Sequence, residues 1–121
     1  MVARLSRLVA VLVFAFAMSV TQPAHADTLT VSMSCYITGP YPGYPGYAAY
    51  SCTAYPAGGT GSYTAYTWTT YSGWYNSYTY SGGQTENFGC KYNTVRSHDV
   101  TVTDSSGATA SASGGIYCTP Q

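Results

Sequence analysis

Residues 48–55 read AAYSCTAY, and this stretch decides the fold class. Every second position, at Tyr50, Cys52 and Ala54, holds an apolar side chain or a cysteine, and polar residues lie between them. Successive side chains of a strand point to opposite faces of its sheet. The period of two therefore predicts a strand with one buried face that carries a cysteine.

The same alternation recurs along the chain at a spacing of 8–12 residues, with Gly, Pro, Asn, Asp and Ser between the runs. No stretch after residue 26 has helical spacing. Short alternating strands at this spacing are typical of a β-sandwich, so we expect an all-β sandwich of about seven strands, with Tyr50, Tyr66, Trp68 and Phe88 facing inward. The expected strands cover residues 29–37, 48–55, 63–71, 74–80, 86–92 and 98–103, and a last one runs from 108 to near 118.

The first 26 residues have the features of a secretory signal. Arg4 and Arg7 precede an uncharged apolar run at residues 8–20, which is too short to span a bilayer, and small residues follow at the cleavage motif. We expect cleavage after Ala26, which leaves one domain of residues 27–121. The predicted location is extracellular or in the cell envelope.

Four cysteines, all within residues 27–121, predict two disulfides in an exported chain. Zinc would require ligands paired at short spacing, and these cysteines are far apart with His98 as the only histidine of the domain. If the first strand pairs in parallel with the last, Cys35 lies near Cys118. Cys52 and Cys90 then form the second bond.

The charges of residues 27–121 exclude several classes of partner. Lys91 and Arg96 are the only basic residues, against four acidic ones, which gives a formal charge of −2. Nucleic-acid binding and attachment to anionic membranes both need clustered basic residues. We therefore expect no nucleic-acid partner, no membrane insertion after signal cleavage, and no cofactor. An extracellular protein or a polysaccharide stays open as the partner.

Several segments together resemble immunoglobulin-like domains of the PKD (polycystic kidney disease) type. They are CTA at 52–54, GGTG at 58–61, YTW at 66–68 and VTVTDSSGATAS at 100–111. The similarity covers roughly residues 50–113, and the last segment matches the final hairpin of that family. PKD domains typically continue after the tryptophan with Asp, Phe and a Gly-Asp-Gly turn, whereas this chain reads TTYSG at 69–73. The resemblance is thus to immunoglobulin-like domains broadly, and it implies a noncatalytic binding or spacer module.

The sequence offers no catalytic constellation. His98 and Asp99 are neighbours on an expected strand, so their side chains point to opposite faces and do not form a dyad. We expect His98 at the surface or at a sheet edge, and Asp104 as a turn residue. No serine lies in a nucleophile-elbow motif. We therefore expect a protein that is not an enzyme.

Tyrosine is the unusual residue, with 14 copies, all after residue 26. Residues 39–47 read GPYPGYPGY, which predicts an exposed loop or a short polyproline-like excursion. Exposed tyrosines make adaptable contact surfaces because the rings are large and rigid. We weigh three roles: a protein- or surface-binding module, a carbohydrate-binding module, and a structural protein with adhesive or cross-linkable tyrosines. The candidate binding residues are Tyr41, Tyr44, Tyr47, Tyr63, Tyr71, Trp74 and Tyr75.

Overall fold

The computed structural model describes residues 27–72 and 76–121, and this part of the chain is all-β. The predicted signal peptide, at residues 1–26, lies outside the described residues. No helix of the described part is long and apolar enough to cross a membrane. The seven strands are β1 (Asp27–Pro40), β2 (Tyr47–Gly59), β3 (Tyr63–Ser72), β4 (Asn76–Gly82), β5 (Thr85–Lys91), β6 (Val95–Asp104) and β7 (Thr109–Tyr117).

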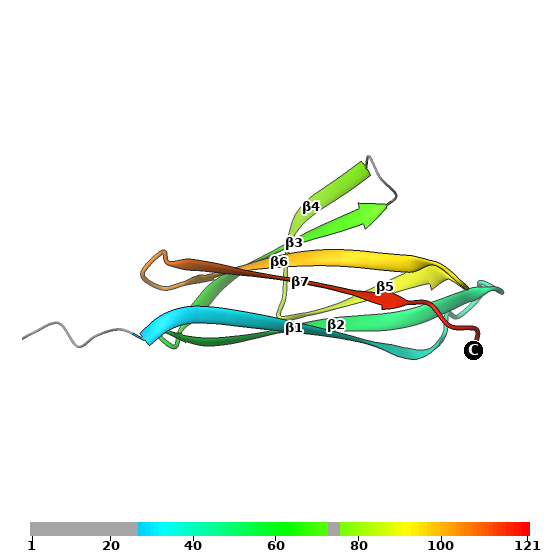
Figure 1. Cartoon of the computed structure of the whole chain (residues 1–121), viewed down its shortest axis with the longest axis horizontal. Helices are drawn as coiled ribbons and strands as arrows, with labels where there is room; N and C mark the ends of the chain where they lie inside the picture. The colour runs from blue at the N-terminus through cyan, green and yellow to red at the C-terminus, as the bar shows by residue number, and fades with distance from the viewer. Residues whose placement is uncertain (1–26, 73–75) are drawn as a thin grey trace, which may run out of the picture.

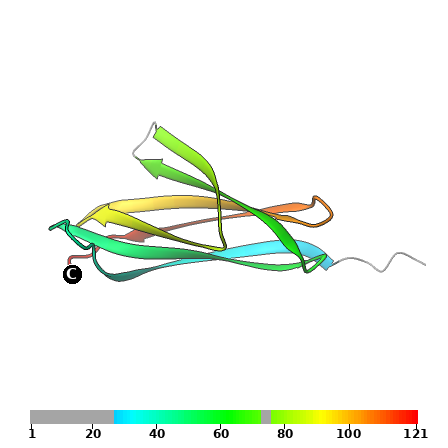
Figure 2. The same ribbon diagram turned by 180° about the vertical axis from the view of Figure 1, so that it is seen from behind.

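The strands form two antiparallel sheets that pack face to face, which confirms the predicted β-sandwich (Figure 1). One sheet has the order β1-β2-β5 and the other has the order β4-β3-β6-β7. The chain changes sheet between β2 and β3, between β4 and β5, and between β5 and β6. The β1–β2 loop and the C-terminus lie at one end of the sandwich, and the start of β1 and the β6–β7 turn lie at the other (Figures 1 and 2).

The core follows the predicted alternation. Tyr50, Cys52 and Ala54 of β2 are buried, and Trp68 of β3 has no exposed surface. Phe88 is half-buried and packs against this cluster, with its ring centroid 6.3 Å from that of Trp68. Aromatic rings thus fill a core that has few Leu and Ile side chains, since large rings bury much apolar area per residue.

The predicted disulfide pairing is wrong. The structure joins Cys35 to Cys52 and Cys90 to Cys118. β1 does not pair in parallel with the last strand, but forms an antiparallel hairpin with β2 in which Cys35 and Cys52 are direct register partners with Cα atoms 4.0 Å apart. The reason is local: residues 41–46 fold as a tight connection rather than a long excursion, so consecutive strands pair.

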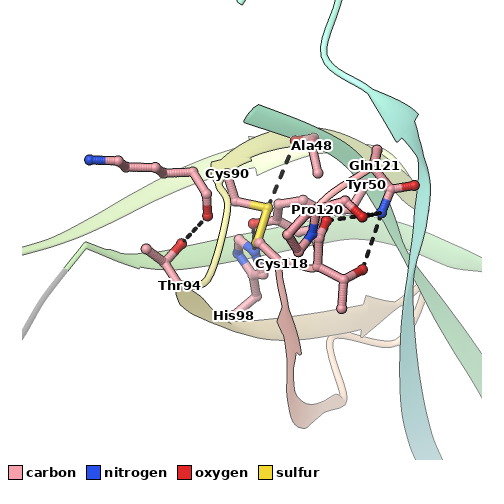
Figure 3. Close-up of a disulfide and its surroundings, with 10 residues drawn as sticks. Ala48, Tyr50, Cys90, Thr94, His98, Cys118, Pro120 and Gln121 are labelled. Atoms are coloured by element: carbon pink, nitrogen blue, oxygen red, sulfur yellow. Dashed lines mark hydrogen bonds between the residues drawn. A yellow bond between two sulfur atoms is a disulfide. The ribbon is translucent and has the colours of Figure 1, made fainter. Parts of the chain in front are cut away.

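The second disulfide connects the two sheets. Cys90 is the penultimate residue of β5 in one sheet, and Cys118 follows β7 of the other; both are fully buried. Tyr50 and His98 lie beside this bond (Figure 3). Backbone hydrogen bonds fix the segment around it, because Cys118 N–H donates to Thr94 O at 2.8 Å and Asn93 N–H donates to Cys118 O at 2.7 Å.

Two strands extend beyond their predicted ends, because their backbone pairing continues through residues that usually form turns. β2 runs on through Pro56 to Gly59, because β1 continues alongside it, and β6 begins at Val95 rather than at His98. Asp104 is the turn residue that the sequence predicts: its Oδ1 accepts hydrogen bonds from the amides of Ser106 and Ala108. The carboxylate therefore closes the β6–β7 hairpin.

The four-stranded sheet is one strand wider than its partner, and β4 projects beyond it (Figure 2). Tyr80 is the register partner of Trp68, so both side chains point to the same face of the sheet. On β4 this face is largely open: Tyr78 is 68% exposed, and its ring stacks on Tyr80 with centroids 5.6 Å apart.

The two disulfides should contribute differently to stability. We predict that replacing Cys90 and Cys118 by alanine lowers the free energy of unfolding by roughly 3–4 kcal/mol, because the bond closes a loop and joins the two sheets. Replacing Cys35 and Cys52 should cost less, since the β1–β2 ladder stays paired without the bond. Urea denaturation of the two double variants measures this, and a larger loss in the Cys35/Cys52 variant would contradict it.

Candidate functional site

The β1–β2 loop consists of two consecutive turns with the same sequence, Tyr-Pro-Gly-Tyr. In the first, Tyr44 N–H donates to Tyr41 O at 3.2 Å; in the second, Tyr47 N–H donates to Tyr44 O at 3.2 Å. Each turn has proline in its second position and a glycine of positive φ in its third, 78° at Gly43 and 82° at Gly46. These are the requirements of a type II turn. The polyproline-like alternative is therefore wrong for this loop.

Hydrogen bonds to neighbouring strands hold the two turns in place. Tyr41 N–H donates to Tyr47 O at 2.9 Å and closes the loop at its base. Tyr92 N–H, just after β5, donates to Gly46 O at 2.8 Å. The loop is thus anchored to both β2 and β5, and its backbone is ordered by pairing rather than by side-chain packing alone.

The two turns bring three tyrosine rings together around a cavity of about 260 Å³, lined by Tyr41, Tyr44, Tyr47 and Gly89. We call this site the tyrosine cup. The ring centroids of Tyr41 and Tyr44 are 5.3 Å apart with planes inclined at 74°, and those of Tyr44 and Tyr47 are 6.2 Å apart at 71°. Such edge-to-face pairs are a preferred aromatic geometry. The inclined rings therefore line an open hollow instead of forming a flat row.

Gly89 of β5 has no side chain, and the Tyr41 ring occupies the space beside it. A Cβ atom at this position would lie 2.6 Å from Cε2 of Tyr41, which is shorter than any van der Waals contact. Only glycine allows the Tyr41 ring to rest on the β5 backbone in its present position. No local sequence pattern indicates this role, because the contact joins residues far apart in the chain.

The cup exposes its rings and leaves their hydroxyls available. Tyr44 is 61% exposed, while Tyr41 and Tyr47 are each close to 40%. None of the three hydroxyls makes a hydrogen bond to a described residue. Other tyrosine hydroxyls are engaged within the fold: Tyr63 donates to Gly58 O at 3.0 Å and Tyr71 donates to Asp99 Oδ2 at 2.5 Å. The cup thus gathers three exposed aromatic rings whose hydroxyls make no hydrogen bond to a described residue.

The remaining candidate binding residues do not join the cup. Tyr63, predicted on the outward face, packs against the core, because the β3–β6 register shifts between Tyr63 and Ala65 and turns its side chain inward. Tyr71 is exposed, and its bond to Asp99 places it on the outer face of the four-stranded sheet. Trp74 and Tyr75 lie outside the described residues. The structure thus brings together only the three tyrosines of the loop.

The prediction that His98 lies at the surface or at a sheet edge is wrong. The side chain is fully buried between the sheets. Its Nε2 lies 2.6 Å from the Tyr50 hydroxyl and its Nδ1 lies 3.1 Å from Thr70 Oγ1. Its ring stacks on Phe88 at a centroid distance of 4.2 Å. A single neutral tautomer satisfies both bonds, with Tyr50 donating to Nε2 and Nδ1–H donating to Thr70. The imidazole is therefore a hydrogen-bonded core residue.

Burial governs the protonation of this pair. It lowers the pKa of His98 to about 4, and the positive charge of Arg96 acts in the same direction. Burial also raises the pKa of Tyr50 to about 12, so the phenol stays protonated near neutral pH. Both groups are neutral under ordinary conditions, as expected for polar side chains in an apolar core.

The acidic side chains serve turns and strand surfaces. Asp99 lies on the opposite face of β6 from His98, and hydrogen bonds from Ser113 and Tyr71 lower its pKa. The pKa of Asp104 is lowered chiefly by its hydrogen bond from Ser106. No three His, Cys, Asp or Glu side chains of residues 27–72 and 76–121 cluster as metal ligands would.

Comparison with known proteins identifies no relative. No protein-family model matches the chain, and no curated protein or solved structure is significantly similar to it.

The Gly89 contact can be tested by adding one methyl group. We predict that Gly89→Ala displaces the Tyr41 ring and opens the cup, while the free energy of unfolding changes by less than about 1 kcal/mol because an exposed side chain absorbs the clash. Two-dimensional NMR would show shifts confined to residues near 41 and 89. An unchanged Tyr41 ring environment would contradict the contact.

The burial of His98 predicts a pH-dependent stability. Between pH 6.5 and 4 the unfolded chain protonates His98 while the folded protein excludes that proton, so stability falls as the pH drops through this window. We expect a loss of about 1–3 kcal/mol, and a constant contribution above pH 6.5. Urea midpoints at pH 4.5 and 7 measure it, and His98→Gln should flatten the profile. An equally steep profile in that variant would assign the loss to other groups.

Proposed function

We propose that this chain is an exported, noncatalytic binding module of the immunoglobulin-like type, and that the tyrosine cup is its contact surface. The observation that carries the proposal is the pair of Pro-Gly turns, which hold three exposed rings around one hollow. Rings that are already ordered lose little conformational entropy when a partner binds.

The immunoglobulin-like assignment is supported by the order of the strands. Constant-type immunoglobulin domains have their first, second, fourth and fifth strands in one sheet and their third, sixth and seventh in the other. This chain has the same grouping except for β4, which pairs with β3 in the other sheet. Loops at the ends of such sandwiches commonly carry the binding surface, and the cup lies in one of these end loops.

Export is supported by the signal-like N-terminal sequence and by the cysteines. All four form disulfides, and disulfides persist mainly in oxidising compartments outside the cytosol. A domain of this size also gains from such bonds, because a small core by itself provides little net stability.

The cup's size and shape favour insertion of a single group. A cavity of about 260 Å³ falls below the roughly 300–1,000 Å³ of pockets that enclose a drug-sized ligand. The partner would therefore place one ring or one side chain among the tyrosines, and the surrounding surface would add the remaining contacts. A flat stacking platform for a polysaccharide chain would instead require coplanar rings.

Affinity capture tests this proposal. The oxidised domain, immobilised, is expected to retain a component of the culture medium or cell envelope, and changing Tyr41, Tyr44 and Tyr47 to serine should abolish the retention. The matched control changes Tyr36, Tyr55 and Tyr78 to serine, which removes three strand tyrosines that are each more than half exposed. The cup is refuted as contact surface if the loop variant retains as much of the component as the unaltered domain, or if the control variant loses as much as the loop variant.

A further inference from the structure

We infer that the tyrosine cup binds one residue of an acidic polysaccharide, a uronic acid whose carboxylate pairs with Lys91. This inference rests on the proposed function and names the ligand class of the same site. Three observations carry it: the position of Lys91, the distribution of charge along the sandwich, and the chemistry of the cup.

Lys91 is the charged side chain that the sheet places next to the cup. It is the register partner of Tyr47 across β2 and β5, so both side chains point to the same side of the sheet. Directly opposed residues have Cβ atoms about 4.5–5.5 Å apart, within easy reach of the four-carbon stem of a lysine. Lys91 is exposed.

The basic side chains and two of the acidic ones lie at opposite ends of the sandwich. Both basic residues of the segment 27–121 lie at the end with the cup: Lys91 ends β5, and Arg96 is the second residue of β6. Arg96 keeps a buried Nε that has no hydrogen-bond partner among the described residues. Asp27 begins β1 and Asp104 ends β6, both at the far end. A ligand that approaches the cup therefore meets the positive charge of Lys91, which favours an anion over a cation.

This charge argues against the usual ligand of a cup built from aromatic rings. Quaternary and primary ammonium groups bind the negative faces of such rings, but here the neighbouring side chain is itself a cation and no carboxylate lines the hollow. A neutral or acidic group is the better fit.

The cup offers what a sugar ring requires. Its faces are apolar and suit the C–H groups of a pyranose, while the hydroxyls of Tyr41, Tyr44 and Tyr47 are free to exchange hydrogen bonds with sugar hydroxyls. The inclined rings admit one residue rather than a stacked row. An acidic peptide would also use Lys91, but a pyranose presents C–H faces to the rings and several hydroxyls to the tyrosine hydroxyls within one residue, so the saccharide is favoured.

The probes are alginate, polygalacturonate and hyaluronate, each compared with its own carboxyl-reduced form, which keeps the linkages and removes the charge. We expect binding of at least one uronate polymer to the oxidised domain, and about tenfold or greater weakening when the carboxyls are reduced. Lys91→Gln should weaken binding by a similar factor, and Lys91→Arg should retain it, because the exposed site tolerates either cation.

The outcomes separate this inference from the proposed function. If the cup captures a component of the envelope or medium but binds none of the uronate polymers, the inference fails and the binding module stands. Equal binding of polyglutamate would overturn it in favour of an acidic peptide or of charge alone. Equal binding by the Lys91→Gln variant would remove Lys91 from the site. If the unaltered oxidised domain retains neither a uronate polymer nor any component of the medium or envelope, the proposed function itself is refuted.

Discussion

Two consecutive Pro-Gly turns in residues 41–47 are the constraint on which the rest of this structure depends. Proline presets the second position of each turn, and glycine supplies the positive φ of the third, so seven residues reverse the chain within a few ångströms. This reversal sets β1 against β2 and places Cys35 opposite Cys52. It also gathers three tyrosine rings at one end of the sandwich. Fold and candidate site thus have the same local origin.

The alternation of apolar and polar residues predicts this fold well, because within each strand it indicates which side chains are buried. The inward positions of Tyr50 and Trp68 follow directly from it, and so does the number of strands. Asp104 was equally predictable, since a carboxylate that accepts its own turn's amides is a local event. Composition alone also indicates the loop tyrosines as candidates, because Tyr, Pro and Gly alternate within one short segment.

Features that depend on contacts between distant segments were not predictable in this way. The disulfide pairing required knowing which strands are neighbours, and a parallel β1–β7 pair was the wrong choice. His98 looked like a surface residue because its partners, Tyr50 and Thr70, are 48 and 28 residues away. Tyr63 was assigned to the wrong face, because a register irregularity within β3 breaks the alternation. Gly89 matters only because Tyr41 lies against it.

In the free protein the three rings already surround the hollow, so that a partner meets them in position. Solution NMR of the oxidised domain measures this most directly, through the ring-current shift of the Gly89 Hα protons and the exchange protection of the Tyr44, Tyr47 and Tyr92 amides. We expect strongly shifted Gly89 Hα protons that return to ordinary values in Tyr41→Ser, with all three amides protected. Averaged ring positions and unprotected amides would contradict it.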